Sequence, residues 1–312
     1  MNIKNIKYSC ADDFYQLPGT KSSSFADWDF IQTLSRATGY RNISVTLETD
    51  YKKYILPLLE RKFWSLYPLA FSLPLGLYGG FAVTAEHYKA LLPRIKTFLN
   101  RSIVLQNPFD PALNTAHLPS LLRTSTHVIE LQNFSYEEVF KTFFDAKLRN
   151  QIRKAEKSNL AVQEGNDEKI INLFYELYVM TNRRWGKSNP RYGINFFNAF
   201  AGKPFFEIKL ALHAGQAAAA IVLLKLSGHY LYWFGALNKD YSEYCPNHLL
   251  ISRTIKEAAG NGTGLFNFGA SEKLSAVRKF KESFGAKEVS YDIYFLGNPL
   301  TKYALTNYLR RQ

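Results

Sequence analysis

The spacing of hydrophobic residues predicts strands followed by a helix in the first third of the chain. Alternating runs such as RNISVTLE at 41–48 continue to residue 71 and predict several strands. Residues 84–100 instead repeat Leu and Ile at helical spacing behind Thr84, which predicts a capped helix. RSIVLQN at 101–107 predicts another strand, and the Pro- and Asn-rich stretch after it predicts a domain boundary.

The second half begins with the strand pattern THVIELQ and two predicted helices. Ser135 precedes the first helix and Glu138 follows three residues later, the spacing of a capping box. The second helix covers 145–159, where Leu148, Ile152 and Ala155 mark one buried face.

Further elements follow as far as the C-terminus. Helices are predicted at 167–185, in INFFNAFAG, at 247–262, in SEKLSAVRKFKESFG and in the basic tail. Three strands at 205–213, 216–226 and 229–237 are joined by short turns, which predicts antiparallel pairing. GLFNFG and EVSYDIYFL complete the predicted strands.

These elements predict a mixed α/β (α+β) protein in which helices cover both faces of a mixed, largely antiparallel sheet. A chain of 312 residues exceeds the usual size of one core, so two domains are expected. We place them at 1–125 and 126–312.

Composition narrows the class of protein. Hydrophobic residues make up 46% and aromatic residues 15%, enough for a large core. The net charge of +13 favours anionic partners such as nucleic acid, nucleotide phosphates or an anionic membrane surface. Cys10 and Cys245 form no metal-binding pattern, so no metal site is expected.

The N-terminus lacks the apolar run of a signal peptide. The most apolar window, 67–83, contains two prolines and is short for a bilayer, so no transmembrane segment is expected. The two cysteines could form one disulfide, but a reducing compartment fits them at least as well, so a cytoplasmic protein is expected.

Three stretches of the second half carry a resemblance to a known family. RNQIRKAEKSNLAV, YWFGALNKDYSEYCPNHLLISRTIKEAAGNGTGLFNFG and RKFKESFGA resemble the second domain of the FemAB-type N-acyltransferases of the GNAT superfamily. FSLPLGLYGG resembles a loop of their first domain, and the resemblance covers most of 60–290. It implies two GNAT-like domains and transfer of an acyl group from an activated donor to an amine acceptor.

The resemblance implies acyl-CoA as a co-substrate, with no tightly bound cofactor. GNAT enzymes that use acyl-CoA usually carry a Gly-rich turn before the helix after the central strands, and its amides hold the pyrophosphate. Here that turn reads YCPNHLL, without glycine. A tRNA-linked donor, as in Fem-type aminoacyl transfer to a peptidoglycan precursor, therefore stays open. A non-catalytic GNAT-like module that binds RNA is the third alternative.

Two residues are the candidates for catalysis. Lys281 matches the lysine of the family's Phe-Lys pair and would contact the donor or stabilise the oxyanion; the alternative is a solvated lysine on a helix face. His248, in the first turn of the helix at 247–262, could take a proton from the acceptor amine; the alternative is an exposed first-turn residue.

The remaining candidates concern binding. We assign donor binding to residues around the same two helices, namely Asn247, Phe280, Arg278 and Ser271. Acceptor or phosphate binding falls to Arg149, Arg153, Arg184, Trp185 and Tyr232. Several of them have a structural alternative: Asn247 as a helix cap, Tyr232 as core, and the arginines as solvated charge.

Overall fold

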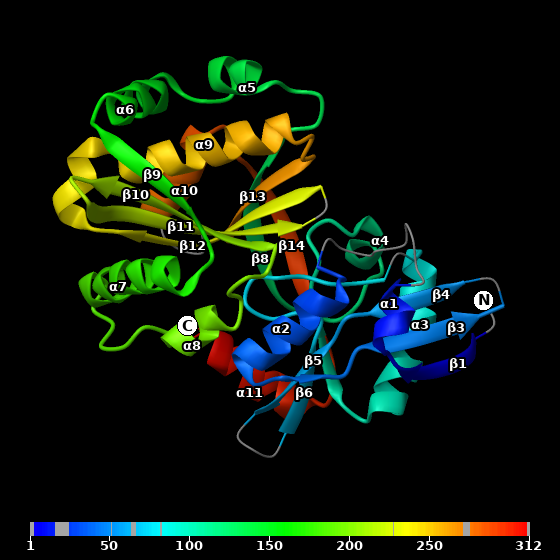
Figure 1. Cartoon of the computed structure of the whole chain (residues 1–312). Coiled ribbons are helices and arrows are strands. Elements are labelled where there is room, and N and C mark those ends of the chain that lie inside the picture. The colour runs from blue at the N-terminus through cyan, green and yellow to red at the C-terminus, as the bar shows by residue number, and fades with distance from the viewer. Residues whose placement is uncertain are drawn as a thin grey trace. The chain divides into compact units, whose positions relative to one another are not determined.

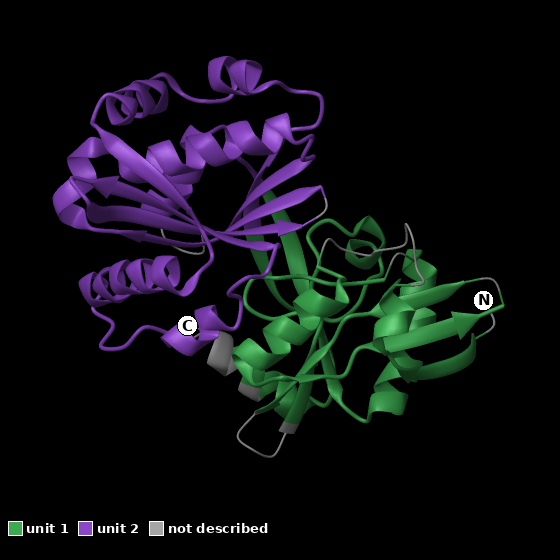
Figure 2. Cartoon of the chain, in the orientation of Figure 1, with its two compact units in different colours: residues 1–125, 289–312 green, residues 126–288 purple. Residues whose placement is uncertain are grey.

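The chain folds into two compact units in the computed structural model. The structure describes residues 3–15, 25–50, 52–63, 67–81, 83–226, 228–270 and 275–310. Unit 1 comprises Met1–Ser125 and Val289–Gln312, and unit 2 comprises Thr126–Glu288 (Figure 2). The mixed α/β class predicted from the sequence is confirmed in both units (Figure 1).

Unit 1 contains two groups of strands. In the first, β3 (Val45–Thr49) lies between β1 (Ile3–Tyr8) and β4 (Lys53–Leu56), all antiparallel. The second follows the order β2 (Arg41–Asn42), β5 (Leu59–Phe63), β6 (Tyr67–Phe71), β7 (Ser102–Leu105) and β14 (Lys287–Leu296). Only the β6–β7 pair of this second group is parallel.

The helices of unit 1 are α1 (Ala11–Tyr15), α2 (Trp28–Thr38), α3 (Ala85–Leu99), α4 (Pro111–Asn114) and α11 (Pro299–Arg310). The predicted helix behind Thr84 is α3, and the Thr84 side chain accepts a hydrogen bond from the His87 N–H. Pro93 lies on the exposed face of α3 and does not end it. Helix α2 was not predicted, although Asp27 caps its start and Gly39, with φ 70°, ends it.

The C-terminal segment differs from the predicted division into 1–125 and 126–312. Residues 289–312 group with unit 1, because Tyr294 of β14 pairs with Leu105 of β7. Leu305 of α11 packs with Leu69 and Val104 in the same unit. A strand joins the sheet edge that it complements, however far away that edge lies in the sequence.

The sheet of unit 2 has the order β8 (Ser120–Glu130), β13 (Leu265–Ala270), β12 (His229–Leu237), β11 (Gln216–Leu226), β10 (Phe206–His213) and β9 (Leu160–Gly165). The three strands predicted to be antiparallel are β10, β11 and β12, and they are confirmed as such. Strand β9 was not predicted. The β12–β13 pair is parallel.

Helices cover both faces of this sheet (Figure 1). One face carries α5 (Tyr136–Thr142), α6 (Ala146–Glu156), α9 (Pro246–Gly260) and α10 (Ser275–Ser283), and the other carries α7 (Glu168–Arg184) and α8 (Ile194–Asn198). The predicted capping box of α5 is present in both directions. Leu148, Ile152 and Ala155 of α6 are fully buried, as their spacing predicted.

Candidate functional site

Strands β12 and β13 separate after a short parallel contact. They pair at only three positions, and the last joins Leu231 to Asn267. Strand β12 then continues to Leu237 without pairing to β13, and its register with β11 shifts between Tyr232 and Phe234. Backbone N–H groups on an unpaired strand edge are free to bind a ligand. We define the separated part, 232–237 with 268–270, as the strand opening.

The first turn of α9 offers few backbone donors. Cys245 precedes it in a left-handed conformation (φ 55°), and Pro246 has no N–H. The N–H groups of His248 and Leu249 both donate to the Cys245 carbonyl, at 3.1 and 3.4 Å. Only the Asn247 N–H stays without an acceptor among the described residues, so this turn does not fit the multi-amide cradle that a CoA pyrophosphate uses.

Two side-chain atoms in the same turn are buried without a partner among the described residues. They are Asn247 Oδ1 and His248 Nδ1. A buried polar atom without a hydrogen bond costs free energy, so such atoms in a folded protein call for an explanation. A substrate that bonds to them on binding provides one.

His248 lies against aromatic side chains of α10 and the residue after it. Its ring centroid is 5.1 Å from that of Phe280, edge to face, and 6.4 Å from that of Phe284. Burial lowers the pKa of His248 below its usual value and outweighs the Cys245 backbone carbonyl, which interacts with the imidazole and favours its charged form. The predicted pair His248 and Phe280 is therefore in contact.

Tyr232 lies at the start of the strand opening. Its ring meets Phe268 of β13 edge to face at 6.4 Å, and burial raises the pKa of Tyr232 to about 12. A Cβ at Gly235 would lie 1.8 Å from the Tyr232 hydroxyl oxygen, so only glycine leaves room for this phenol. The phenol is protonated at neutral pH and makes no hydrogen bond to another described residue.

Lys281 of α10 is buried, with 2% of its surface exposed. Its Nζ donates to the carbonyl oxygens of Gly269 at 2.8 Å and Ala270 at 2.7 Å. This excludes the solvated-lysine interpretation, and it also differs from a lysine at the rim of a cleft. Lys281 thus fixes the backbone at the end of β13, which forms one side of the strand opening.

The other candidates from α10 lie elsewhere or outside the described residues. Arg278 is exposed and donates to Glu282 and Glu288, each at 2.8 Å, so its guanidinium is engaged in ion pairs. Lys279 is exposed on the same helix. Ser271 and Lys273 fall outside the residues that the structure describes.

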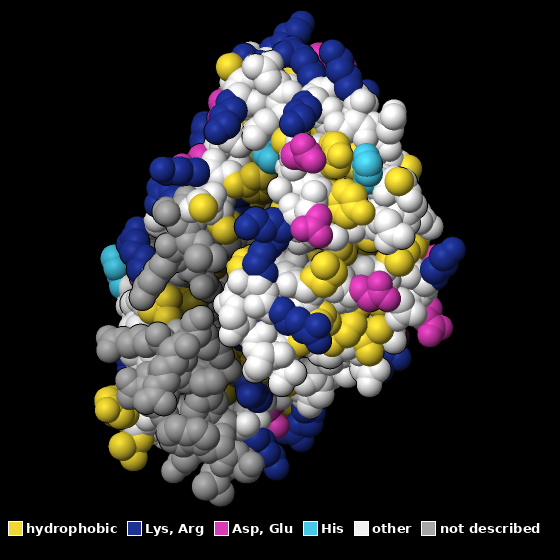
Figure 3. Space-filling model, turned by 90° about the vertical axis from the view of Figure 1, so that its left-hand side faces the viewer, with side chains coloured by type: hydrophobic (Ala, Val, Ile, Leu, Met, Phe, Trp, Pro, Cys, Tyr) yellow, Lys and Arg dark blue, Asp and Glu magenta, His cyan; other side chains and the backbone are white. Residues whose placement is uncertain are grey.

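The arginines of α6 have local partners. Arg149 Nη1 donates to the carbonyls of Lys141 and Phe144 and so caps the C-terminal end of α5. Arg153 is exposed and lies 5.6 Å over the Phe140 ring. On the face drawn in Figure 3, Lys and Arg side chains are scattered among hydrophobic and acidic ones and form no single patch.

Arg184 and Trp185 lie at the end of α7, on the other face of the sheet. Arg184 Nη1 donates to the Leu237 carbonyl at 3.1 Å, where β12 ends. Trp185 is 56% exposed. The structure thus brings His248, Phe280, Tyr232 and Lys281 to one face of the sheet at the strand opening. Arg184 and Trp185 lie on the other face, where Arg184 reaches the last residue of β12.

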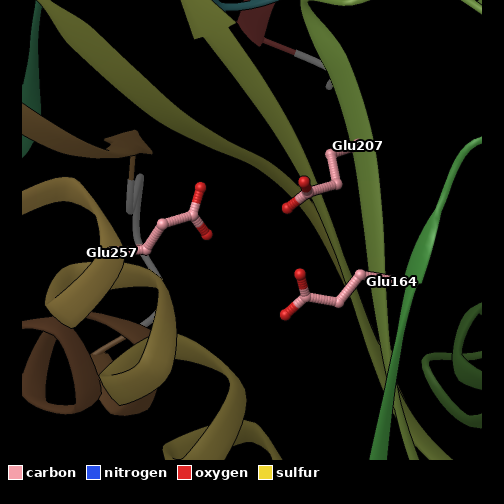
Figure 4. Close-up of side chains that lie close together, drawn as sticks. All are labelled: Glu164, Glu207 and Glu257. Atoms are coloured by element: carbon pink, nitrogen blue, oxygen red, sulfur yellow. The ribbon is translucent and has the colours of Figure 1, made fainter. Parts of the chain in front are cut away.

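A cluster of charged residues was missed from the sequence. Glu164, Glu207 and Glu257 converge from β9, β10 and α9 (Figure 4). Lys209 Nζ lies 2.6, 3.1 and 2.8 Å from their carboxylates, so an ammonium group fills the space between them. Burial alone would raise the pKa of Glu257, but hydrogen bonds from Lys209 and Lys225 outweigh it and lower that pKa. The sequence signal for this cluster was the alternation of Glu207 and Lys209 along one predicted strand.

Comparison with known proteins finds one family profile and several solved structures that this chain resembles. Residues 143–282 match the family profile described as an acetyltransferase (GNAT) domain. The crystal structure of FemX is similar at 15% identity with a TM-score of 0.75, covering 96% of this chain and 99% of FemX. No curated protein matches the sequence.

Two further solved structures resemble the whole chain. The C-terminal domain of a putative lysylphosphatidylglycerol synthetase from Agrobacterium fabrum has 11% identity and a TM-score of 0.62, covering 96% of this chain and 94% of that domain. A tandem GNAT protein from the clavulanic acid biosynthesis pathway has 10% identity and a TM-score of 0.50, covering 93% and 97%. At these identities the structures show the fold, which is the FemAB-like GNAT fold expected from the sequence. The stretch that matches the acetyltransferase (GNAT) profile lies within unit 2. No described helix is long and apolar enough to cross a membrane.

Proposed function

We propose that the protein transfers an acyl group from an activated ester or thioester to an amine, at the strand opening of unit 2. The observation that carries this proposal is the buried His248 Nδ1, which has no partner among the described residues and belongs to a neutral ring. A neutral imidazole with an open nitrogen can accept a proton from an attacking amine. Asn247 Oδ1 beside it can orient that amine.

The reaction begins when the amine nitrogen attacks the donor carbonyl carbon. His248 accepts the proton that the amine loses, and the carbonyl oxygen becomes an oxyanion. Backbone N–H groups on the free edge of β12 stabilise this oxyanion. The bond from carbon to the leaving oxygen or sulfur then breaks, and the Tyr232 phenol protonates the leaving group. Lys281 acts as a positioning residue that fixes the end of β13.

Two acyl donors are compatible with this proposal. Acyl-CoA is the usual donor of GNAT domains, but the first turn of α9 leaves one amide for a pyrophosphate. This favours a donor bound by other groups, and an aminoacyl ester carried on tRNA is the second candidate. Both cysteines are free thiols, as in a reducing compartment, and a cytoplasmic location is part of the proposal.

The test is an acyl-transfer assay on the full chain with acetyl-CoA or with aminoacyl-tRNA, against a panel of primary amines. We expect turnover with at least one donor and a loss of about 100-fold or more in His248→Ala. His87→Ala on α3 is the control, because His87 lies in unit 1. Equal turnover in His248→Ala and the natural chain would overturn the role of His248. Binding of tRNA with steep salt dependence and no turnover would instead favour the RNA-binding module.

A further inference from the structure

Unit 1 contains a pocket of its own, lined by residues that take no part in the proposed acyl transfer. It lies between the end of α2, strand β2 and strand β5, and its volume is about 610 Å³. Its walls are Thr38, Gly39, Tyr40, Arg41, Glu60, Arg61, Lys62 and Arg101. Pockets of this size hold small molecules.

A buried carboxylate orients two of the arginines. The side chain of Glu60 is 6% exposed; its Oε1 lies 3.0 Å from Arg41 Nη2 and its Oε2 lies 2.6 Å from Arg101 Nε. Charged hydrogen bonds of this kind hold a guanidinium in a fixed plane. The only further hydrogen bond that either guanidinium makes to a described residue joins Arg101 Nη1 to the Asn100 carbonyl. Several guanidinium N–H groups are thus left for a ligand.

The charge of the pocket is unbalanced. Four cationic side chains line it against the single carboxylate of Glu60. Lys62 is exposed and makes no ion pair with any described residue, and the Arg61 guanidinium lies 5.6 Å from the centre of the Tyr40 ring. Cations gathered in a concave site attract anions with more than one negative charge.

We propose that this pocket binds a phosphate or diphosphate group of a small molecule. Guanidinium forks match the geometry of phosphate oxygens, and a dianion offsets more of the excess charge than a carboxylate does. Because the pocket is larger than one phosphate, the group belongs to a larger molecule. If Arg41 and Arg101 served only as ion-pair partners of Glu60, Lys62 would contribute nothing to anion binding.

Titration calorimetry with pyrophosphate on the full chain at low salt tests this proposal. We expect saturable one-to-one binding, weakened about tenfold in Lys62→Ala, since one charged contact is lost. Lys89→Ala is the matched control, because Lys89 is exposed in the same unit and does not line the pocket. Arg41→Lys keeps the positive charge but loses the paired N–H donors of the guanidinium, so we expect this variant to bind pyrophosphate more weakly as well.

Two results would overturn the proposal. One is no saturable binding of pyrophosphate at millimolar concentration. The other is an equal loss of affinity in Lys62→Ala and Lys89→Ala, which would mean a general effect of net charge. Neither measurement uses acyl transfer, so failure here and failure of the proposed function are distinguishable. Displacement of bound pyrophosphate by a nucleoside diphosphate or by phosphatidylglycerol vesicles would support the site and identify the source of the phosphate.

Discussion

The ammonium of Lys281 lies 2.8 Å from the carbonyl oxygen of Gly269, at the point where β13 leaves β12. Gly269 has φ 69°, and its N–H donates to Asn267 Oδ1 at 2.8 Å. A Cβ on Gly269 would lie 3.5 Å from the Tyr232 carbonyl oxygen, so the lysine fixes a backbone turn beside the backbone of Tyr232. Lys281, which is only 2% exposed, therefore acts on the strand opening through the backbone at the end of β13.

Lys281→Met should lower kcat of the cognate reaction by about 100-fold and change KM little. A displacement of reacting groups by about 1 Å can lower the rate of a reaction by that factor. It should also lower the free energy of unfolding by about 1–3 kcal/mol, since two partly buried carbonyl oxygens lose their charged donor. Lys279→Met is the control on the exposed face of the same helix. Steady-state kinetics and urea denaturation measure both effects. An unchanged kcat would contradict the positioning role.

The rate should depend on the protonation of His248. Burial lowers the pKa of this imidazole, so the base form persists below pH 6.5, and kcat/KM should fall only as the pH drops through that lowered value. A pH–rate profile on the acid side measures it. The residual activity of His248→Gln should lack this acid limb. An acid limb of equal position and steepness in the variant would assign the titration to another group.

Gly235→Ala should damage the site through Tyr232. The new methyl group would fall 1.8 Å from the phenol oxygen, so the ring must move and both activity and melting temperature should decrease. In a Tyr232→Ala background the same substitution should cost much less. A double-mutant cycle on thermal stability gives the coupling, for which we expect about 1–3 kcal/mol. Additive effects would show that the two residues are independent.

Lys209→Ala should destabilise unit 2 by about 3–5 kcal/mol, because Glu164 loses its ion pair with Lys209 while Glu207 and Glu257 keep only Lys225. The vacated space lies between carboxylate oxygens within 4.8 Å of one another, which suits a calcium ion. Millimolar Ca²⁺ should therefore raise the melting temperature of the variant and leave the natural chain unchanged. Lys169→Ala, an exposed lysine of α7, is the control. An unchanged melting temperature of the variant in Ca²⁺ would refute the prediction that the three carboxylates can bind this ion.

Stability should fall in acid because of His229. Burial lowers the pKa of His229 to about 3, against 6.5 for the free side chain. Between these values the unfolded chain binds a proton that the folded chain does not, so stability is lost as the pH falls below 6.5. At pH 5 this amounts to about 2 kcal/mol. His229→Phe should show a correspondingly shallower decline between pH 7 and 5 in urea denaturation, and an unchanged decline would contradict it.

Local signals determined most elements of the chain. The Thr84 cap predicted α3, the Ser135–Glu138 pair predicted the start of α5, and the four-residue spacing of Leu148 and Ile152 predicted the buried face of α6. Caps and periodicity depend on neighbours within one or two turns, so they can be read from the sequence. Residues before 41 were left unassigned although α2 carries the same signals, Asp27 at its start and Gly39 at its end.

The candidate site followed from the sequence only in part. Resemblance to the family selected Lys281 and Phe280, and helix position selected His248, but neither showed that Lys281 is buried on two carbonyls. Arg149 and Arg278, chosen for their charge, have partners in the fold that no spacing rule predicts. Charge marks a residue as able to bind an anion, whereas its partners depend on which elements pack beside it.

The sequence by itself determined the mixed α/β class, the antiparallel run of β10 to β12 and the GNAT resemblance. Only the tertiary structure decided that β14 joins β7, that β12 and β13 part after Leu231, and that Lys209 lies among three glutamates. The physical reason is distance along the chain. Helix caps and strand alternation arise from contacts between near neighbours, whereas strand partners and buried charge networks arise between residues up to about 190 positions apart, through packing that no local pattern encodes.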